Sequence, residues 1–213
     1  MNEKKVALFD LDGVVFDTEP LYTQFWSKVF EQYHPEQPSL VTAIKGQTLI
    51  WIYDRYFTNS PQLQHEITTQ LTAFEQIMPF EYVFGFEEFM SQLHQLNVKT
   101  AVVTSSNKSK MQQVYNQHPD FKACFDHVFT AEDFIESKPH PYCYQLGASF
   151  FGVKPVECVA FEDSINGFKA VTAAGMPLVG LSTSNPIEVI SEYAEVVIPN
   201  YLQVNFTDLC AKL

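Results

Sequence analysis

The sequence predicts an α/β protein in which a doubly wound, mostly parallel β-sheet carries an inserted group of helices. Short apolar runs of strand length recur along the chain, and amphipathic helical patterns lie between the later ones. Strands that alternate with helices form a mostly parallel sheet that is covered on both faces. Between the first strand and Phe86, by contrast, the pattern is helical and contains no convincing strand. A chain of 213 residues is long enough for one full core and one smaller inserted domain.

The first strand is the compact apolar run Val6–Phe9, which ends at an acidic turn that contains glycine. Further strands are predicted at similar runs, namely Thr100–Val103, Val159–Phe161, Pro177–Leu181 and Val196–Ile198. Helices are predicted over Phe86–Leu96 and Asn166–Ala174, and Gly175 is a favourable C-terminal stop for the second of them. Another helix is expected to begin near Pro186, because proline is favoured in a first helical turn.

The insert is predicted to consist of helices between Pro20 and Met78. The first has an apolar face made of Leu21, Phe25, Val29, Phe30 and Tyr33. The others are predicted over Ser39–Gly46, Thr48–Phe57 and Gln62–Met78, and Pro79 closes the last one. We therefore expect a helical cap domain over residues 17–84, inserted into a core domain formed by residues 1–16 and 85–213.

Composition excludes several classes of partner. The formal net charge is −12, which disfavours nucleic acids and anionic membranes, since both attract basic surfaces.

The N-terminal segment is too soon interrupted by charge for a signal peptide, and no apolar run approaches the length of a membrane span. The cysteines are scattered without metal-ligand spacing, as is typical of reduced thiols in a cytoplasmic protein. Nothing in the sequence demands more than a monomer.

Two acidic pairs follow predicted strands, at the edge where open parallel sheets form their active sites. Within the pair Asp10 and Asp12, one carboxylate can attack phosphorus, while the other protonates the leaving oxygen and then deprotonates water. In isolation this pair would also fit a surface turn. Glu162 and Asp163 form the second pair, and so many carboxylates in one place favour a Mg²⁺ ion with oxygen ligands. Asp163 or Ser164 could also cap the helix that follows.

Two further segments could hold a phosphate group. The turn Thr104, Ser105, Ser106 and Asn107 offers hydroxyl and backbone N–H groups that can bind phosphate oxygens, although it could simply cap the next helix. Lys138 stands in the proline-stiffened loop 137–141, where a fixed ammonium would neutralise a nucleophile and a phosphoryl group. The alternative for Lys138 is an ordinary solvated lysine.

Together these segments resemble the motifs of the haloacid dehalogenase-like superfamily of phosphatases. The motifs are similar, in chain order, to Phe9–Pro20, Val103–Asn107, Lys138–Pro141 and Phe161–Gly167, with Ala173–Met176 after the last. The resemblance spans essentially the whole chain, and the subgroup is β-phosphoglucomutase-like. It implies a Rossmann-like core with a helical cap inserted after the first motif.

The resemblance implies roles for the core residues. Asp10 would be the nucleophile and a metal ligand, and Asp12 would be the general acid/base and would bind the metal through its backbone carbonyl. Thr104 and the Ser105 amide would hold the phosphoryl group, which Lys138 would bridge to the nucleophile.

The same resemblance implies a metal site and a lid. Asp163 would bind Mg²⁺ directly, and Glu162 would bind it directly or through water. The helical insert would be a mobile lid that touches the leaving group. From the geometry expected of such a lid, Lys45, Gln47 and Thr48 are candidate substrate contacts.

The predicted function is Mg²⁺-dependent hydrolysis of a small phosphorylated metabolite, such as a sugar phosphate, through an aspartyl-phosphate. The alternative is a β-phosphoglucomutase-type phosphohexomutase, which is expected to have an arginine where this chain has Leu49 and a histidine where it has Tyr22. Leucine cannot make the charged, bidentate contact that anchors a second phosphate. A non-catalytic binding module, a haloacid dehalogenase proper and a serine hydrolase are weaker alternatives, because every phosphotransfer position is filled and no Gly-x-Ser-x-Gly surrounds Ser105 or Ser106.

Overall fold

A computed structural model describes residues 4–213 and contains a parallel sheet of strand order β3-β2-β1-β4-β5-β6. Every neighbouring pair of strands is parallel, which confirms the predicted α/β fold class. The strands are β1 (Val6–Phe9), β2 (Lys99–Val103), β3 (His127–Phe129), β4 (Cys158–Glu162), β5 (Leu178–Leu181) and β6 (Val196–Ile198). The sequence analysis located all of these except β3, a short edge strand in which only Phe129 is buried.

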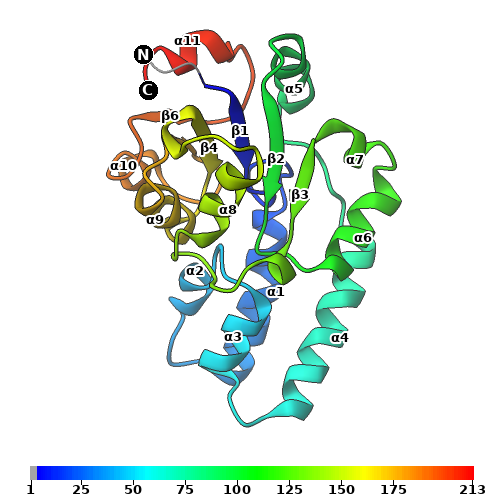
Figure 1. Ribbon diagram of the computed structural model, residues 1–213. Coiled ribbons are helices and arrows are strands. Elements are labelled where there is room, and N and C mark those ends of the chain that lie inside the picture. The colour runs from blue at the N-terminus through cyan, green and yellow to red at the C-terminus, as the bar shows by residue number, and fades with distance from the viewer. Residues whose placement is uncertain (1–3) are drawn as a thin grey trace.

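The two faces of the sheet carry separate apolar clusters, because successive side chains of a strand point to opposite faces. In β1, Ala7 and Phe9 belong to one cluster, whereas Val6 and Leu8 belong to the other. The first cluster is covered by α5 (Phe86–Gln95), α6 (Lys108–Gln117), α7 (Phe121–Cys124) and α11 (Phe206–Cys210). The second is covered by α8 (Tyr142–Phe150), α9 (Ile165–Ala173) and α10 (Ile187–Ile190). The central strands are thus buried on both sides, as Figure 1 shows.

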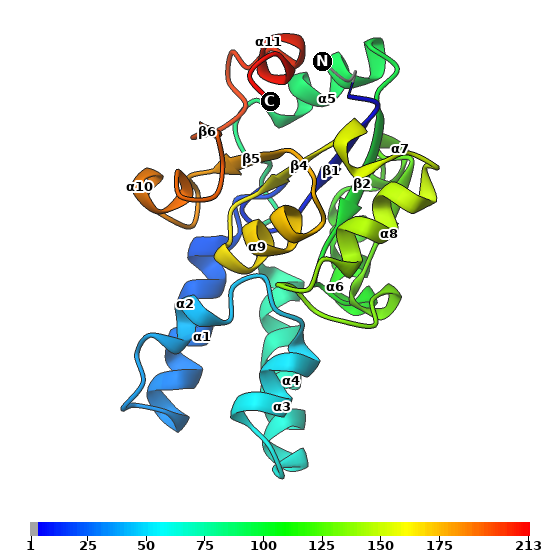
Figure 2. The same ribbon diagram turned by 60° about the vertical axis from the view of Figure 1, so that its left-hand side comes forward.

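The helical insert comprises α1 (Glu19–Tyr33), α2 (Leu40–Ala43), α3 (Leu49–Tyr56) and α4 (Pro61–Ile77). Figure 2 shows these helices projecting from the end of the sheet at which β1 finishes. They share an apolar cluster that includes Trp26, Phe30, Ile52, Phe57 and Ile67. The insert therefore has its own core in addition to the two that cover the sheet.

Local sequence explains where the insert helices begin and end. Thr48 caps α3, since its hydroxyl accepts a hydrogen bond from the backbone N–H of Trp51. Helix α4 ends at Ile77, one residue before the predicted end, because Met78 precedes Pro79 and adopts an extended conformation. Over residues 4–213, no helix combines the length and the apolar character needed to cross a membrane.

Strand β5 packs tightly against α10, and a glycine allows this contact. A Cβ at Gly180 would lie 2.2 Å from Cγ2 of Ile190. In the loop after β5, Thr183, Ser184 and Asn185 donate hydrogen bonds to Asp163, the residue that follows β4. The packing of β5 against α10 therefore also helps to position these three side chains beside Asp163.

Gly180→Ala should reduce the free energy of unfolding by about 1–3 kcal/mol, as measured by urea denaturation, because the added methyl group overpacks the core. In an Ile190→Ala background the same substitution should cost clearly less, because the atom that it would strike has been removed. Equal costs in the two backgrounds would show that this contact does not limit the packing.

Candidate active site

The acidic residues that follow β1 and β4 meet because these strands are neighbours in register, with Phe9 opposite Phe161. Carboxylate oxygens of Asp10, Glu162 and Asp163 lie within 4.8 Å of one another, and all three residues are buried. Gly13 makes the turn after β1 with a φ of +72°, and a Cβ at this position would lie 2.0 Å from Oδ2 of Asp163. Glycine is therefore required here both for its backbone conformation and for space.

Lys138 brings a buried cation to this acidic cluster. Its side chain is 1% exposed, and its Nζ lies 2.6 Å from Oδ1 of Asp10 and 2.5 Å from Oε1 of Glu162. The third donor position is used by the carbonyl oxygen of Val103 at 3.2 Å. Burial opposes the charged form, but the charges of Asp10 and Glu162 outweigh it and raise the pKa of Lys138 above its ordinary value.

Glu162 is fully buried, and protein groups occupy both of its carboxylate oxygens. Oε1 accepts from Lys138 and from the hydroxyl of Tyr144 at 2.7 Å. Oε2 accepts from the backbone N–H of Asp163 and from the N–H and hydroxyl of Ser164. Gly167 leaves room for this carboxylate, because a Cβ there would lie 1.9 Å from Cδ of Glu162. Glu162 is thus fixed in position and in turn orients Lys138.

Asp163 and Asp10 are acidic groups that the protein alone does not fully compensate. Burial, followed by the charges of Glu19, Glu162 and Asp10, raises the pKa of Asp163 well above its ordinary value. Burial likewise raises the pKa of Asp10 to about 7, although Lys138 acts in the opposite direction. Ser184 donates a hydrogen bond to Oδ2 of Asp163. This set of oxygen donors, with its unbalanced negative charge, fits a hard divalent cation.

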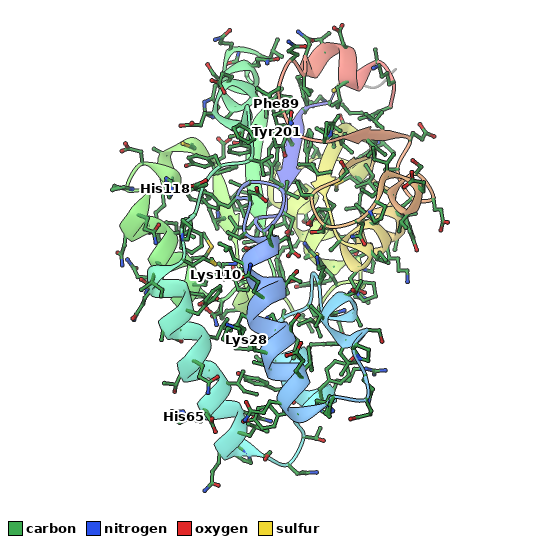
Figure 3. The ribbon with its side chains drawn as sticks, turned by 180° about the vertical axis from the view of Figure 1, so that it is seen from behind. Lys28, His65, Phe89, Lys110, His118 and Tyr201 are labelled. Atoms are coloured by element: carbon green, nitrogen blue, oxygen red, sulfur yellow. The ribbon has the colours of Figure 1, made fainter. Side chains whose placement is uncertain are left out.

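Asp12 lies on the other side of the turn and has its own lysine. Nζ of Lys110 lies 2.6 Å from Oδ1 and 2.5 Å from Oδ2 of Asp12, and the hydroxyls of Thr18 and Ser106 also donate to this carboxylate. Lys110 projects from α6, is 4% exposed and lies close to α1, as Figure 3 shows. Its ammonium lies 4.3 Å from the centre of the Tyr22 ring, a cation–π contact.

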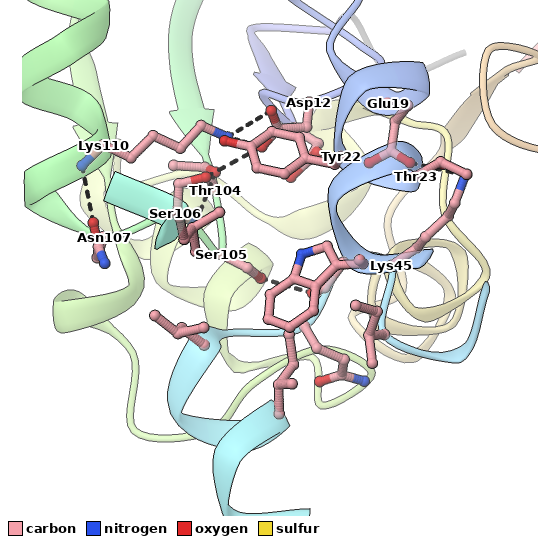
Figure 4. Close-up of a pocket in the computed structure, with 18 of the residues that line it drawn as sticks. Asp12, Glu19, Tyr22, Thr23, Lys45, Thr104, Ser105, Ser106, Asn107 and Lys110 are labelled. Atoms are coloured by element: carbon pink, nitrogen blue, oxygen red, sulfur yellow. Dashed lines mark hydrogen bonds and ion pairs between the residues drawn. The ribbon is translucent and has the colours of Figure 1, made fainter. Parts of the chain in front are cut away.

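The turn after β2 contributes to both the core and the contact with the insert. Thr104 is buried, and its hydroxyl accepts from the backbone N–H of Ser106. The Ser105 hydroxyl donates to the carbonyl of Gly46 at 2.7 Å, so this side chain contacts the insert. The side chain of Asn107 caps α6 by accepting a hydrogen bond from the backbone N–H of Lys110, so this turn does cap the next helix, as one of the two interpretations of the sequence predicted. All four residues of this turn line one cavity together with Asp10, Asp12 and Asp163 (Figure 4).

The structure separates the three candidate substrate contacts of the insert. Lys45 and Gln47 line the cavity, but Lys45 forms an ion pair of 2.8 Å with Glu19, and Gln47 accepts from the hydroxyl of Ser137. Thr48 is not among the described residues that line the cavity, so the structure does not support the expectation that it faces substrate, which stays a prediction. Its hydroxyl caps α3, and its N–H donates to Ser137.

Several residues of the site escaped the sequence analysis. Lys110 looks like a solvated lysine in the polar sequence of α6, and only the folded structure reveals its ion pair with Asp12 of the turn after β1. Tyr144, Ser184 and Glu75 are likewise brought in from distant segments, and Glu75 accepts from the Tyr22 hydroxyl at 2.8 Å. The helical spacing that would bury Glu75 on α4 was the one available signal, since it shares a face with Leu71.

Known proteins resemble this chain over most of its length. A family model for haloacid dehalogenase-like hydrolases matches residues 4–175. The validoxylamine A 7'-phosphate phosphatase of Streptomyces hygroscopicus subsp. limoneus is 28% identical over 207 residues, which cover 95% of this chain and 96% of the relative. Hexitol phosphatase B of Escherichia coli strain K12 is 30% identical over 181 residues, or 80% of each chain.

A solved structure extends this similarity to the fold. The crystal structure of β-phosphoglucomutase from Clostridium difficile superposes with a TM-score of 0.78 at 23% identity, and the match covers 98% of this chain and 96% of that one. The β-phosphoglucomutase of Bacillus subtilis strain 168 is also 28% identical over 197 residues, which cover 86% of this chain and 85% of the relative, and this confirms the predicted resemblance to β-phosphoglucomutase-like proteins. Sequence motifs, strand order and the family match agree, and the chain belongs to the haloacid dehalogenase-like hydrolase family.

Proposed function

We propose that this protein is a Mg²⁺-dependent phosphatase that hydrolyses a small phosphorylated metabolite through an aspartyl-phosphate on Asp10. The observation that carries the proposal is the placement of Asp10, which contacts the Lys138 ammonium at 2.6 Å and lies beside Asp163 and Glu162. The phosphatases among its relatives support the same reaction class. Residues 17–84 would act as the cap of a core formed by residues 1–16 and 85–213.

The reaction would proceed in two steps at the two aspartates. Asp10 attacks phosphorus and forms an acyl phosphate, while Asp12 donates a proton to the leaving oxygen. Asp12 then removes a proton from the water that attacks the phosphorus, which releases inorganic phosphate and restores Asp10. Lys138 holds the Asp10 carboxylate in position, and Thr104 and the turn that follows it would bind the phosphoryl oxygens.

The carboxylates of Asp10 and Asp163 and the backbone carbonyl of Asp12 would hold Mg²⁺. When bound, the ion offsets the charge of the acidic cluster and of the phosphoryl group. Because both oxygens of Glu162 already accept hydrogen bonds from protein groups, we favour a water-mediated contact for this residue over a direct one. The raised pKa values of Asp10 and Asp163 agree with a site that needs a cation.

The mutase alternative is supported less well by the cavity. Leu49 lines it with an apolar side chain where a phosphate-binding arginine would be expected, and Tyr22 is engaged with Glu75. Lys45 and Lys110, the lysines that line the cavity, are both paired with carboxylates. The acceptor of the phosphoryl group is therefore proposed to be water.

The four cysteines are free thiols, which supports a reducing compartment such as the cytoplasm.

Asp10→Asn should lower the turnover of p-nitrophenyl phosphate by a factor of about a thousand or more, because an amide cannot act as the nucleophile. Release of nitrophenolate measures this activity. The matched variant Asp17→Asn alters an exposed aspartate nearby and should behave like the natural protein. Substantial activity in Asp10→Asn would contradict the assignment of the nucleophile.

Mg²⁺ should raise the melting temperature more at about pH 8 than at about pH 5. Asp10 and Asp163 have raised pKa values in the folded state, so the metal-free fold holds more protons than the unfolded chain in the window above their ordinary values. Its stability therefore falls as the pH rises through that window. Bound Mg²⁺ replaces the lost protons. Thermal unfolding in EDTA and in Mg²⁺ measures the difference, and equal shifts at both pH values would argue against the site.

Lys110→Met should reduce kcat/KM by about tenfold to a hundredfold, because the side chain keeps its length but no longer holds Asp12. The loss should be larger for an alkyl phosphate than for p-nitrophenyl phosphate, since the nitrophenolate needs little protonation to leave. Lys108→Met, an exposed change in the first turn of α6, serves as the control. An equal loss for both substrates would indicate a general effect on the site and not an effect on Asp12.

A further inference from the structure

The cavity above Asp10 and Asp12 ends in an apolar wall that contains a buried carboxylate. The wall is made by side chains of the insert, including Trp26, Ile44, Leu49, Ile52 and Leu71. Glu75 of α4 lies among them and is 6% exposed. A carboxylate in such surroundings is costly unless a hydrogen-bond donor or a cation compensates it.

Glu75 is only partly compensated by the protein. Its Oε1 accepts from the Tyr22 hydroxyl at 2.8 Å, and within residues 4–213 no group donates to its Oε2. Burial raises the pKa of Glu75, although the charge of Lys110 acts against this effect. The cavity therefore contains an acceptor oxygen with no donor from the described chain.

Charge restricts what could occupy this end of the cavity. Both lysines that line it are paired, Lys45 with Glu19 at 2.8 Å and Lys110 with Asp12 at 2.5 Å. A second phosphate or a carboxylate on the leaving group would therefore meet no unpaired cation there, and Glu75 would repel it. A neutral or cationic group with a hydrogen-bond donor would be favoured.

We propose that Glu75 binds a hydroxyl or ammonium group on the leaving group of the substrate, while the ring or aliphatic body of that group packs on the apolar wall. The substrate class is then a monophosphate of a cyclic or branched alcohol that carries a donor remote from the phosphoester. This inference rests on the proposed phosphatase function. The Tyr22 ring links the two ends of the cavity, since Lys110 lies over its face on the Asp12 side and its hydroxyl reaches Glu75.

A set of cyclohexyl phosphates of similar shape tests the proposal. The probes are cyclohexyl phosphate, its trans-4-hydroxy and trans-4-amino derivatives, and the trans-1,4-bisphosphate. With Mg²⁺, at least one of the hydroxy and amino compounds should have a kcat/KM about tenfold or more above that of cyclohexyl phosphate, as a hydrogen bond to a charged group predicts. The bisphosphate should be the poorest substrate. Comparison of the hydroxy and amino compounds shows whether a neutral or a charged donor is preferred.

Glu75→Gln retains the volume of the side chain and an acceptor for the Tyr22 hydroxyl, but removes the charge. It should reduce the preference for the favoured donor compound over cyclohexyl phosphate, and by about tenfold or more where that donor is the ammonium. The ratio from two substrates in competition does not depend on the fraction of folded enzyme, so partial misfolding cannot imitate this result. Glu66→Gln makes the same chemical change on the exposed face of α4 and should preserve the ratio.

The outcomes separate this inference from the phosphatase proposal. If p-nitrophenyl phosphate and all four probes remain intact, the phosphatase proposal fails and this inference fails with it. If p-nitrophenyl phosphate is hydrolysed but the probes are untouched, or if they are hydrolysed without any preference for a donor, only the role of Glu75 is overturned. If Glu75→Gln leaves the preference for a donor compound over cyclohexyl phosphate unchanged, the proposed role of Glu75 is overturned as well.

Discussion

The bond between Lys138 and two buried carboxylates is the constraint on which the rest of the site depends. Three acidic side chains lie within 4.8 Å of one another at the end of the sheet, where burial makes each negative charge costly. Lys138 partly balances them and fixes the distance between Asp10 and Glu162. Tyr144 and Ser164 donate hydrogen bonds to Glu162 and hold its carboxylate in place, and the carboxylate in turn holds Lys138 in a single position.

Each of the two aspartates of the turn after β1 is paired with its own lysine. Lys138, from the loop before α8, contacts Asp10, whereas Lys110, from α6, contacts both oxygens of Asp12. The net charge of −12 posed the problem of how so acidic a protein could bind phosphate. The site lysines Lys45, Lys110 and Lys138 are each paired with a carboxylate. Under the proposed function, affinity for phosphate would therefore come mainly from a bound cation and from backbone and hydroxyl donors.

The sequence predicted those parts of the site that depend on chain order at strand ends. Asp10 and Asp163 follow β1 and β4, two apolar runs that were recognisable without the structure, and parallel pairing brings them together. Strand β3 was missed because three residues at a half-exposed edge carry too little pattern. Lys110 and Glu75 could not be assigned a role, because their partners lie in distant segments. Helical spacing could indicate that Glu75 is buried, but it could not identify what Glu75 contacts.

One contact between the insert and the core, that of residues 43–48, is made chiefly through the backbone of the insert. Ser105 donates to the carbonyl of Gly46, Asn166 to the carbonyls of Ala43 and Lys45, and Ser137 accepts from the N–H of Thr48. Apart from Gln47, side chains of the 43–48 loop take no part in these hydrogen bonds. Gly46 is fixed by its φ of +76° and by its close approach to Ser164. Substitutions at the other cavity-lining positions of this loop leave its backbone hydrogen bonds to the core intact, so the lining of the cavity can diversify during evolution while the chemistry below it stays constant.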